Sequence, residues 1–204
     1  IQTRASKSVQ TILDLNKDGV YGTLASLLRV PSQYRIAIEV AAGQRLNDIV
    51  VNDHEVAIEC INYLKQTRAG RATFLPLNKI KPRKLRHEEL SLLKKPGVIG
   101  LAKDLVSYDP KLANAVEHVL GDTIIVENLG VARQLGIGIA RMVTLEGDLI
   151  EKSGVMVGGF YEPKELVSSD ELAKYELNKK ELEEEINFLR VEIGQLNQKL
   201  DELM

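Results

Sequence analysis

The sequence repeats part of itself at an offset of 78 residues, and this repeat limits the possible folds more than any other feature. The matching blocks are GTLASLLRVPSQYRIAIEVAAG (22–43) with GLAKDLVSYDPKLANAVEHVLG (100–121), IVVNDHEVA (49–57) with IIVENLGVA (124–132), and RATFL (71–75) with RMVTL (141–145). Five identical pairs in the first block are Gly22 and Gly100, Leu27 and Leu105, Ala37 and Ala115, Glu39 and Glu117, and Gly43 and Gly121. Because the blocks keep the same order, we interpret them as a duplication that produces two similar lobes.

Both halves predict the same succession of elements. A short apolar helix precedes a second helix, which ends at a glycine suited to a left-handed C-cap, Gly43 or Gly121. A short apolar strand, a further helix and a last strand follow. The expected elements after the first short helix are helices at 33–42 and 110–120, strands in DIVV and TIIV, helices at 53–67 and 129–135, and strands in RATFLPL and RMVTLEG. Strand–helix–strand order implies a parallel pair of strands, so we expect an α+β or α/β fold of two similar lobes, each of mixed sheet and helices.

The C-terminal segment, residues 163–204, has the heptad pattern of a coiled coil. One heptad position holds Leu172, Lys179, Ile186, Ile193 and Leu200, and the other holds Tyr175, Leu182, Leu189, Leu196 and Leu203. Such a two-position stripe is narrower than the apolar face of a helix that docks on a globular body, which is the alternative. At the other end, residues 1–18 place Ile1, Ala5, Val9 and Ile12 on one helical face. We therefore expect the two ends to form antiparallel coiled-coil arms.

Charge is distributed unevenly along the 204 residues, whose formal net charge is −2. Residues 164–204 carry 11 acidic and 6 basic residues, so the remainder, with 18 acidic and 21 basic residues, is mildly basic. The single cysteine, Cys60, excludes a disulfide framework and a CxxC metal site, and its apolar setting predicts a packed, unreactive thiol. No apolar run approaches the length of a membrane span and no signal peptide is visible, so we expect a cytoplasmic protein.

Seven basic residues lie within the segment 78–97, between the two halves of the repeat. They are Lys79, Lys81, Arg83, Lys84, Arg86, Lys94 and Lys95. A patch of this kind can neutralise phosphates without reading bases, which would give weak, salt-dependent binding of DNA. The alternative is a solvated linker with no ligand.

Several phrases resemble the hinge domain of SMC (structural maintenance of chromosomes) proteins, in that family's order. They are GVYGTLASLLRVP, YRIAIEVAAGQRLNDIVV, GRATFLPLNKIKP, YDPKLANAVEHVLGDTIIVE and LEGDLIEKSGVMVGG, over roughly residues 19–160. The resemblance implies hinge lobe I at 19–77, a basic linker at 78–97 and hinge lobe II at 98–162, between coiled-coil segments at 1–18 and 163–204. It also implies a dimerisation hinge of a nucleoid-associated chromosome condensation and segregation ATPase, whose partner is a second hinge that meets it at two interfaces. A homodimer is expected, and a paralogous partner stays open.

The glycine-rich stretch EGDLIEKSGVMVGGF (146–160) decides between a joint and an enzyme. A phosphate loop needs glycines between a strand and the N-terminus of a helix, whereas these glycines surround two short strands, as in a hairpin with a close backbone approach. The resemblance places this segment at the hinge–hinge interface. The expected interface residues are Gly154, Val155, Val157, Gly158 and Gly159. A turn needed only within the monomer is the alternative.

The sequence offers no catalytic, cofactor-binding or metal-binding set of residues. GIGIA (136–140) lacks the third glycine of a dinucleotide loop and follows a helix, and the three histidines have no ligand spacing. The ATP-binding motif GxxxxGK[ST] is absent, so we expect no enzyme activity here, although the resemblance makes the full-length protein an ATPase. The rival hypotheses are a small nucleotide-binding α/β domain with a helical tail, and a scaffold in which the tail alone makes the dimer.

Overall fold

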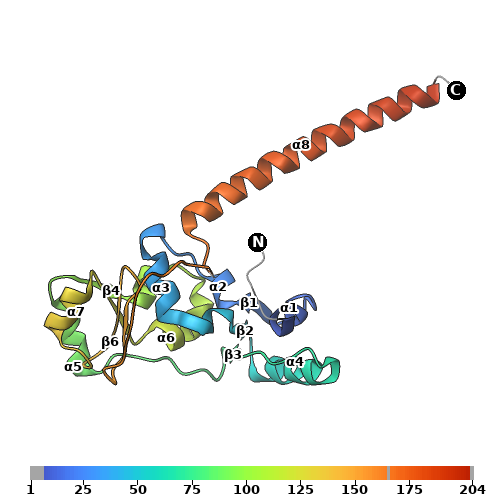
Figure 1. Cartoon of the computed structure of the whole chain (residues 1–204). Coiled ribbons are helices and arrows are strands. Elements are labelled where there is room, and N and C mark those ends of the chain that lie inside the picture. The colour runs from blue at the N-terminus through green and yellow to red at the C-terminus, as the bar shows by residue number, and fades with distance from the viewer. Residues whose placement is uncertain (1–6, 165, 203–204) are drawn as a thin grey trace. The chain divides into compact units, whose positions relative to one another are not determined.

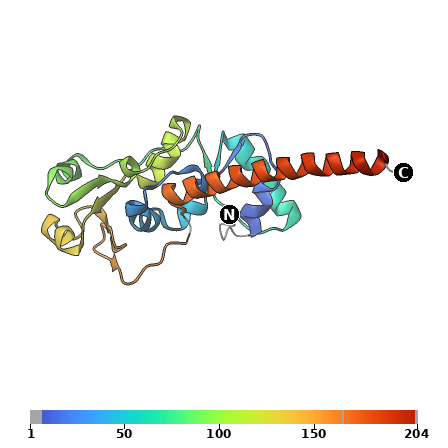
Figure 2. The same ribbon diagram turned by 90° about the horizontal axis from the view of Figure 1, so that it is seen from above.

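The computed structural model describes residues 7–164 and 166–202. The chain divides into two compact units, residues 1–167 and residues 168–204. Figures 1 and 2 show α1 and α4 at one end of the first unit and α5 and α7 at the other, with α3 and α6 between them. No helix of the described residues is both long enough and apolar enough to cross a membrane.

Lobe I contains a three-stranded sheet in the order β1-β2-β3. Strand β2 pairs antiparallel with β1 and parallel with β3, and the crossover between β2 and β3 contains the longest helix of this lobe. The elements are α1 (Lys7–Leu13), β1 (Val20–Thr23), α2 (Leu24–Leu27), η1 (Ser32–Tyr34), α3 (Arg35–Ala42), η2 (Gly43–Asn47), β2 (Ile49–Val51), α4 (His54–Thr67) and β3 (Phe74–Pro76).

Lobe II repeats this arrangement and extends it to a five-stranded sheet, in the order β4-β5-β6-β7-β8. Strands β5 and β6 are parallel, and the other neighbours are antiparallel. The elements are α5 (His87–Leu90), η3 (Ser91–Lys94), β4 (Val98–Leu101), η4 (Ala102–Leu105), η5 (Pro110–Leu112), α6 (Ala113–Leu120), β5 (Thr123–Val126), α7 (Leu129–Leu135), β6 (Arg141–Thr144), β7 (Leu149–Ile150) and β8 (Met156–Val157).

The internal duplication is confirmed by local geometry. Asp53 and Asn128 cap α4 and α7 by accepting a hydrogen bond from the backbone N–H three residues on, at 3.0 and 3.1 Å. Gly22 and Gly100 occupy the same strand irregularity at positive φ. Because these features recur at equivalent positions, the expected fold of two similar lobes is confirmed.

The two lobes pack directly against each other through equivalent residues, and are not connected by the linker alone. Arg29 and Ser107, which are equivalent in the repeat, pair with each other in an antiparallel bridge. Each N–H donates to the other residue's carbonyl, at 2.8 and 2.9 Å. The equivalent helices α3 and α6 also pack together, and one buried hydrophobic cluster draws residues from both lobes. Lobes I and II therefore form one unit.

The alignment of the last repeat block was wrong by two residues. In the sheets, Ile49 lies opposite Phe74 and its equivalent Ile124 lies opposite Met142. Phe74 therefore corresponds to Met142, an offset of 68 rather than the 70 implied by aligning RATFL with RMVTL. A shift of two residues keeps every side chain on the same face of a strand, so the apolar pattern could not reveal it.

Glycine ends the two equivalent helices for different reasons. Gly43 follows α3 at φ +56° and ψ −138°, so it has the positive φ that was expected but not the left-handed helical conformation. Gly121 follows α6 at φ −73°, so the prediction of a left-handed cap is wrong there. A β-carbon at Gly121 would overlap the carbonyl oxygens of Arg83 and Glu117. Glycine is needed at this position because the 78–97 segment runs directly over the end of α6.

The N-terminal helix and the first strand of each lobe differ from expectation. Val9 and Ile12, two residues of the expected coiled-coil face, are buried in the lobe I core with Cys60, so α1 belongs to the lobe, while Ile1 and Ala5 lie outside the described residues. The sequence analysis also missed strands β1 and β4, because their apolar residues are few, half-buried and interrupted by a glycine.

The basic linker is shorter than expected. Leu85 and Leu92 are buried in the hydrophobic cluster of lobe II, and this part of the segment forms α5 and η3. Only the part before Leu85 runs as an extended connection. Two hydrogen bonds attach it to α6: the Arg83 N–H donates to the Glu117 carbonyl at 3.2 Å, and His118 Nδ1 pairs with the Lys81 carbonyl at 2.9 Å.

The second unit is one helix, α8 (Ser169–Glu202). Ser168 and Glu171 form a capping box at its start, in which the Ser168 N–H donates to Glu171 Oε2 at 3.0 Å and the Glu171 N–H donates to Ser168 Oγ at 3.3 Å. The heptad positions Tyr175, Leu182, Ile186, Leu189 and Ile193 are all exposed.

Candidate functional site

The hairpin of β7 and β8 presents an exposed apolar edge. Strand β8 pairs only with β7 among the described residues, so its other side is a free sheet edge. The exposed fractions are 56% for Val155, 51% for Met156, 59% for Val157 and 98% for Phe160. Exposed apolar side chains beside unpaired backbone groups are typical of a surface that receives another chain. Met156 and Phe160 belong to this surface and were missed from the sequence, although Phe160 directly follows the two glycines.

The backbone conformation and packing of this hairpin favour glycine at these positions within a single copy of the chain. Gly154 and Gly159 have φ values of +87° and +127°, which disfavour any other residue. A β-carbon at Gly158 would overlap Oδ1 of Asp148, and the other carboxylate oxygen of Asp148 accepts from Thr144 Oγ1 at 2.9 Å. A role of these glycines in an interface stays a prediction.

Lobe I lacks the strands that cover the equivalent edge of lobe II. In lobe II, β6 pairs with β5 on one side and β7 on the other. In lobe I, β3 pairs with β2 alone among the described residues. The vacant side of β3 and the free side of β8 are thus two sheet edges on different lobes, each able to accept a further strand.

A buried carboxylate, which the sequence analysis did not single out as functional, holds the segment that leads from the hairpin to α8. Glu39 on α3 is 1% exposed. Its Oε1 accepts from Tyr161 Oη at 2.9 Å and from the Lys164 N–H at 2.6 Å, and its Oε2 accepts from the Leu166 N–H at 3.1 Å. Glu39 therefore fixes Tyr161, Lys164 and Leu166 on lobe I. The segment 161–166 that contains them is named here the return segment.

The structure places the seven basic residues of the 78–97 segment on the surface. Lys79, Lys81, Lys84, Arg86, Lys94 and Lys95 are exposed and belong to no ion pair recorded among the described residues. Arg83 is paired with Asp122 at 4.0 Å. Lys79 lies in the turn after β3, and Lys81 and Lys84 lie in the extended stretch that follows it, so the three exposed lysines are close together in the chain.

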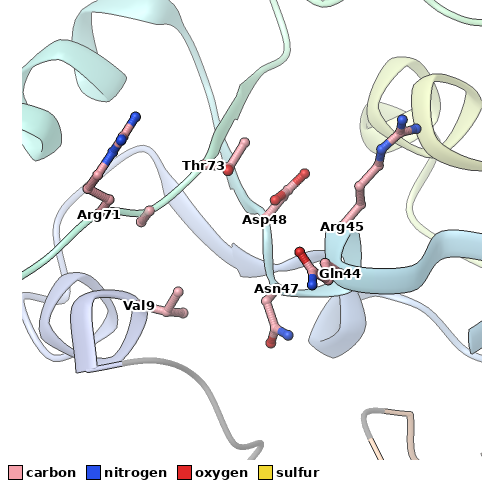
Figure 3. A pocket seen from close by; sticks show the side chains of 8 residues that line it. Val9, Gln44, Arg45, Asn47, Asp48, Arg71 and Thr73 are labelled. Atoms are coloured by element: carbon pink, nitrogen blue, oxygen red, sulfur yellow. The ribbon is translucent and has the colours of Figure 1, made fainter.

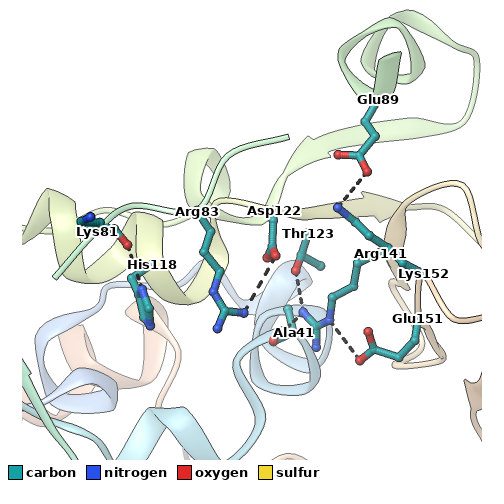
Figure 4. Close-up of polar contacts among 10 residues, drawn as sticks. All are labelled: Ala41, Lys81, Arg83, Glu89, His118, Asp122, Thr123, Arg141, Glu151 and Lys152. Atoms are coloured by element: carbon teal, nitrogen blue, oxygen red, sulfur yellow. Dashed lines mark hydrogen bonds and ion pairs between the residues drawn. The ribbon is translucent and has the colours of Figure 1, made fainter. Parts of the chain in front are cut away.

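Arg83 belongs to a second basic group that the sequence analysis missed. A cavity of about 350 Å³ is lined by side chains from lobe I, the linker and lobe II: Arg45, Arg83, Asp122, Arg141, Glu151, Lys152 and Ser153. Figure 4 shows Arg83 and Arg141 extending in the same direction, with Asp122 and Thr123 between them. Residues separated by about a hundred positions thus meet in space, which no local sequence pattern could reveal.

A nucleotide site of the kind considered in the sequence analysis has no support in the geometry. A cavity of about 640 Å³ lies between α1, η2 and the segment that precedes β3, and Figure 3 shows its lining side chains, including Arg45, Asp48 and Arg71. Burial raises the pKa of the Asp48 carboxyl group from its usual value. No glycine lines this cavity, so it lacks the loop that would hold phosphates.

Comparison with known proteins agrees with this architecture. The sequence profile described as "SMC proteins Flexible Hinge Domain" matches residues 17–136. The chain is 44% identical over 189 residues to chromosome partition protein Smc of Aquifex aeolicus, in an alignment that covers 91% of this chain and 15% of that protein. It is 45% identical over 158 residues to Smc of Gloeobacter violaceus, covering 78% of this chain and 13% of that protein. The chain therefore spans only 13–15% of the length of these curated relatives.

Solved structures show the same fold. The SMC hinge domain of Geobacillus stearothermophilus, solved as an asymmetric dimer, superposes with a TM-score of 0.75 at 34% identity and covers 87% of this chain and 74% of that one. The hinge domain of Pyrococcus furiosus SMC superposes with a TM-score of 0.67 at 43% identity and covers 80% of this chain and 85% of that one. Since the profile also matches more than half of the chain, the chain belongs to the SMC hinge family and is a hinge domain rather than a catalytic head.

Proposed function

We propose that this hinge domain dimerises and so joins two coiled-coil arms. The observation that carries the proposal is the pair of free sheet edges on opposite lobes, β8 with its exposed apolar side chains and β3 with its vacant side. Pairing β8 of one copy with β3 of the other continues both sheets across the contact. A two-fold axis then produces a second, equivalent contact. The dimer that was solved for the Geobacillus stearothermophilus hinge supports a homodimer of this chain.

The longer protein is proposed to act in chromosome partition, as the names of its relatives indicate. In that role the hinge catalyses no reaction. It connects two ATPase subunits within the cytoplasm, at the nucleoid. The exposed heptad stripe of α8 supports an arm that pairs with another helix, because five large apolar or aromatic side chains on one stripe remain uncovered. A force on the arms, or a change in their direction, would be transmitted to the hinge through the return segment.

Charging the β8 edge tests the dimer proposal. The double variant Val157→Glu with Phe160→Glu places two carboxylates in the exposed apolar surface in both contacts of the dimer. Because buried unpaired charges are strongly unfavourable, the dissociation constant of the dimer should rise at least about 100-fold. Sedimentation velocity over a concentration series measures this change.

The matched control is Ile58→Glu, which puts the same charge on an exposed isoleucine of α4. This control should remain dimeric, and circular dichroism should show that both proteins are folded. A double variant with the dissociation constant of the wild type would remove β8 from the interface.

We also propose weak, sequence-independent contact of the 78–97 segment with DNA. The exposure of Lys79, Lys81 and Lys84, which follow closely in the chain, supports it, because such cations can neutralise backbone phosphates. Duplex DNA should bind at low salt and dissociate at moderate salt in a gel-shift assay. The triple change of these three lysines to glutamate should abolish the shift, and retention of the shift would contradict the proposal.

A further inference from the structure

The 350 Å³ cavity between the lobes contains a cation that lacks its own counter-ion. Three of its basic groups have partners: Arg83 with Asp122 at 4.0 Å, Arg141 with Glu151 at 3.1 Å, and Lys152 with Glu89 at 2.7 Å. For the guanidinium group of the half-buried Arg45, the described part of the chain provides no hydrogen bond or ion pair. The unbalanced positive charge of the cavity is therefore that of Arg45.

The surroundings of Arg45 make this charge unfavourable when the cavity is empty. Burial, together with repulsion from Arg83 and Arg141, lowers the pKa of the Arg45 guanidinium from its usual value, and the attraction of Asp122 and Asp48 offsets this only in part. An anion that enters the cavity would weaken the repulsion among the three guanidinium groups. It would also accept hydrogen bonds from Arg45.

Of the neighbouring cations, Arg141 is held by hydrogen bonds of its side chain, and Arg83 is held through its backbone. Arg141 donates from Nη1 to the Ala41 carbonyl at 2.9 Å and to Thr123 Oγ1 at 2.5 Å. The backbone of Arg83 is fixed on α6 by its N–H, and the missing side chain of Gly121 leaves room for its carbonyl. The distance of 4.0 Å between Arg83 and Asp122 exceeds hydrogen-bond length, so the N–H groups of Arg83 remain able to bind another acceptor.

We propose that this cavity binds a phosphate-type oxyanion, held by the guanidinium groups of Arg45 and Arg83. Guanidinium groups match the oxygens of phosphate in two-point hydrogen bonds. The cavity volume is at the lower end of the roughly 300–1,000 Å³ of ligand sites, which suits a phosphate or pyrophosphate group and excludes a duplex. The oxyanion is either a free phosphate compound or a backbone phosphate of DNA that passes the cavity.

Thermal unfolding of the full 204-residue chain with sodium pyrophosphate tests the site. The buffer contains no divalent cation, and sodium chloride matches the ionic strength of the control sample. At about ten times the dissociation constant, the melting temperature of the wild type should rise by about 4 °C. Arg45→Gln should lose this rise, and its melting temperature without pyrophosphate should equal or exceed that of the wild type, because the change removes an unpaired, half-buried charge.

Arg133→Gln is the matched control, since it removes the same charge from an exposed arginine of α7 that does not line the cavity. This control should keep the full response to pyrophosphate. An equal rise in Arg45→Gln and the wild type, or no rise in the wild type up to millimolar pyrophosphate, would overturn the proposal.

Competition with labelled duplex DNA then identifies the source of the phosphate. Displacement of the duplex by pyrophosphate, with weaker duplex binding by Arg45→Gln than by Arg133→Gln, assigns the site to the DNA backbone. Unchanged duplex binding in both variants, with the thermal response of the wild type retained, assigns it to a free phosphate compound.

Discussion

Glu39→Ala should lower the free energy of unfolding by about 3 kcal/mol. The change removes the acceptor of the hydrogen bonds from Tyr161, Lys164 and Leu166 and leaves the buried Leu166 N–H unsatisfied. For a unit of this size, such a loss corresponds to a fall in melting temperature of roughly 6–12 °C. Calorimetry measures it, and limited proteolysis should show faster cleavage within the return segment, 161–166.

The internal repeat provides the control for this prediction. Glu117 is the equivalent of Glu39, but its carboxylate lies partly exposed and pairs with Lys103 at 3.2 Å. Glu117→Ala should therefore cost no more than about 1 kcal/mol. Equal effects at the two positions would show that the return segment is held by its apolar contacts, chiefly Leu166, and not by Glu39.

Gly121→Ala should also be strongly destabilising, by about 3 kcal/mol. The added methyl group would overlap the carbonyl oxygens of Arg83 and Glu117, and neither backbone can move without breaking the hydrogen bond between them. We expect the linker to detach from α6 over residues 81–85. Denaturant unfolding measures the loss, and hydrogen exchange should show increased opening of the Arg83 N–H.

Gly43→Ala is the comparison, because Gly43 is the equivalent glycine after α3. Its added methyl group would meet no atom within 4 Å, and only the φ of +56° is unfavourable for alanine. The expected cost is about 2 kcal/mol, because φ +56° with ψ −138° is a conformation that residues other than glycine rarely adopt. A Gly121→Ala protein no less stable than Gly43→Ala would mean that the linker does not press on α6.

The sequence predicted those parts of the fold that local patterns determine. Helices α4 and α7 were predicted with nearly the observed bounds, because an N-cap and an apolar face mark each of them. Strands β2 and β5 were predicted because they are fully buried and thus uniformly apolar. The predicted alignment of β3 with its equivalent strand β6 was wrong by two residues, since a shift of two leaves the apolar alternation unchanged.

The features that depend on contacts between distant segments were not predictable in this way. The heptad-like face of α1 is apolar because it enters the lobe I core, and a coiled-coil partner would require the same pattern. Glu39 looked equivalent to Glu117, and only the return of residues 161–166 to α3 gives it a different role. Likewise, Arg45 and Arg141 are unremarkable in sequence and meet only through the packing of two lobes.

The central claim is that the globular unit, and not α8, makes the joint between two copies. Residues 1–167 contain all three hydrophobic clusters and form a compact unit, so a fragment of these residues should fold. The most direct measurement is its solution mass by sedimentation at several concentrations, beside the full chain. A dimer of the fragment is the predicted result. A monomeric fragment beside a dimeric full chain would place the joint in α8 and contradict the proposed hinge mechanism.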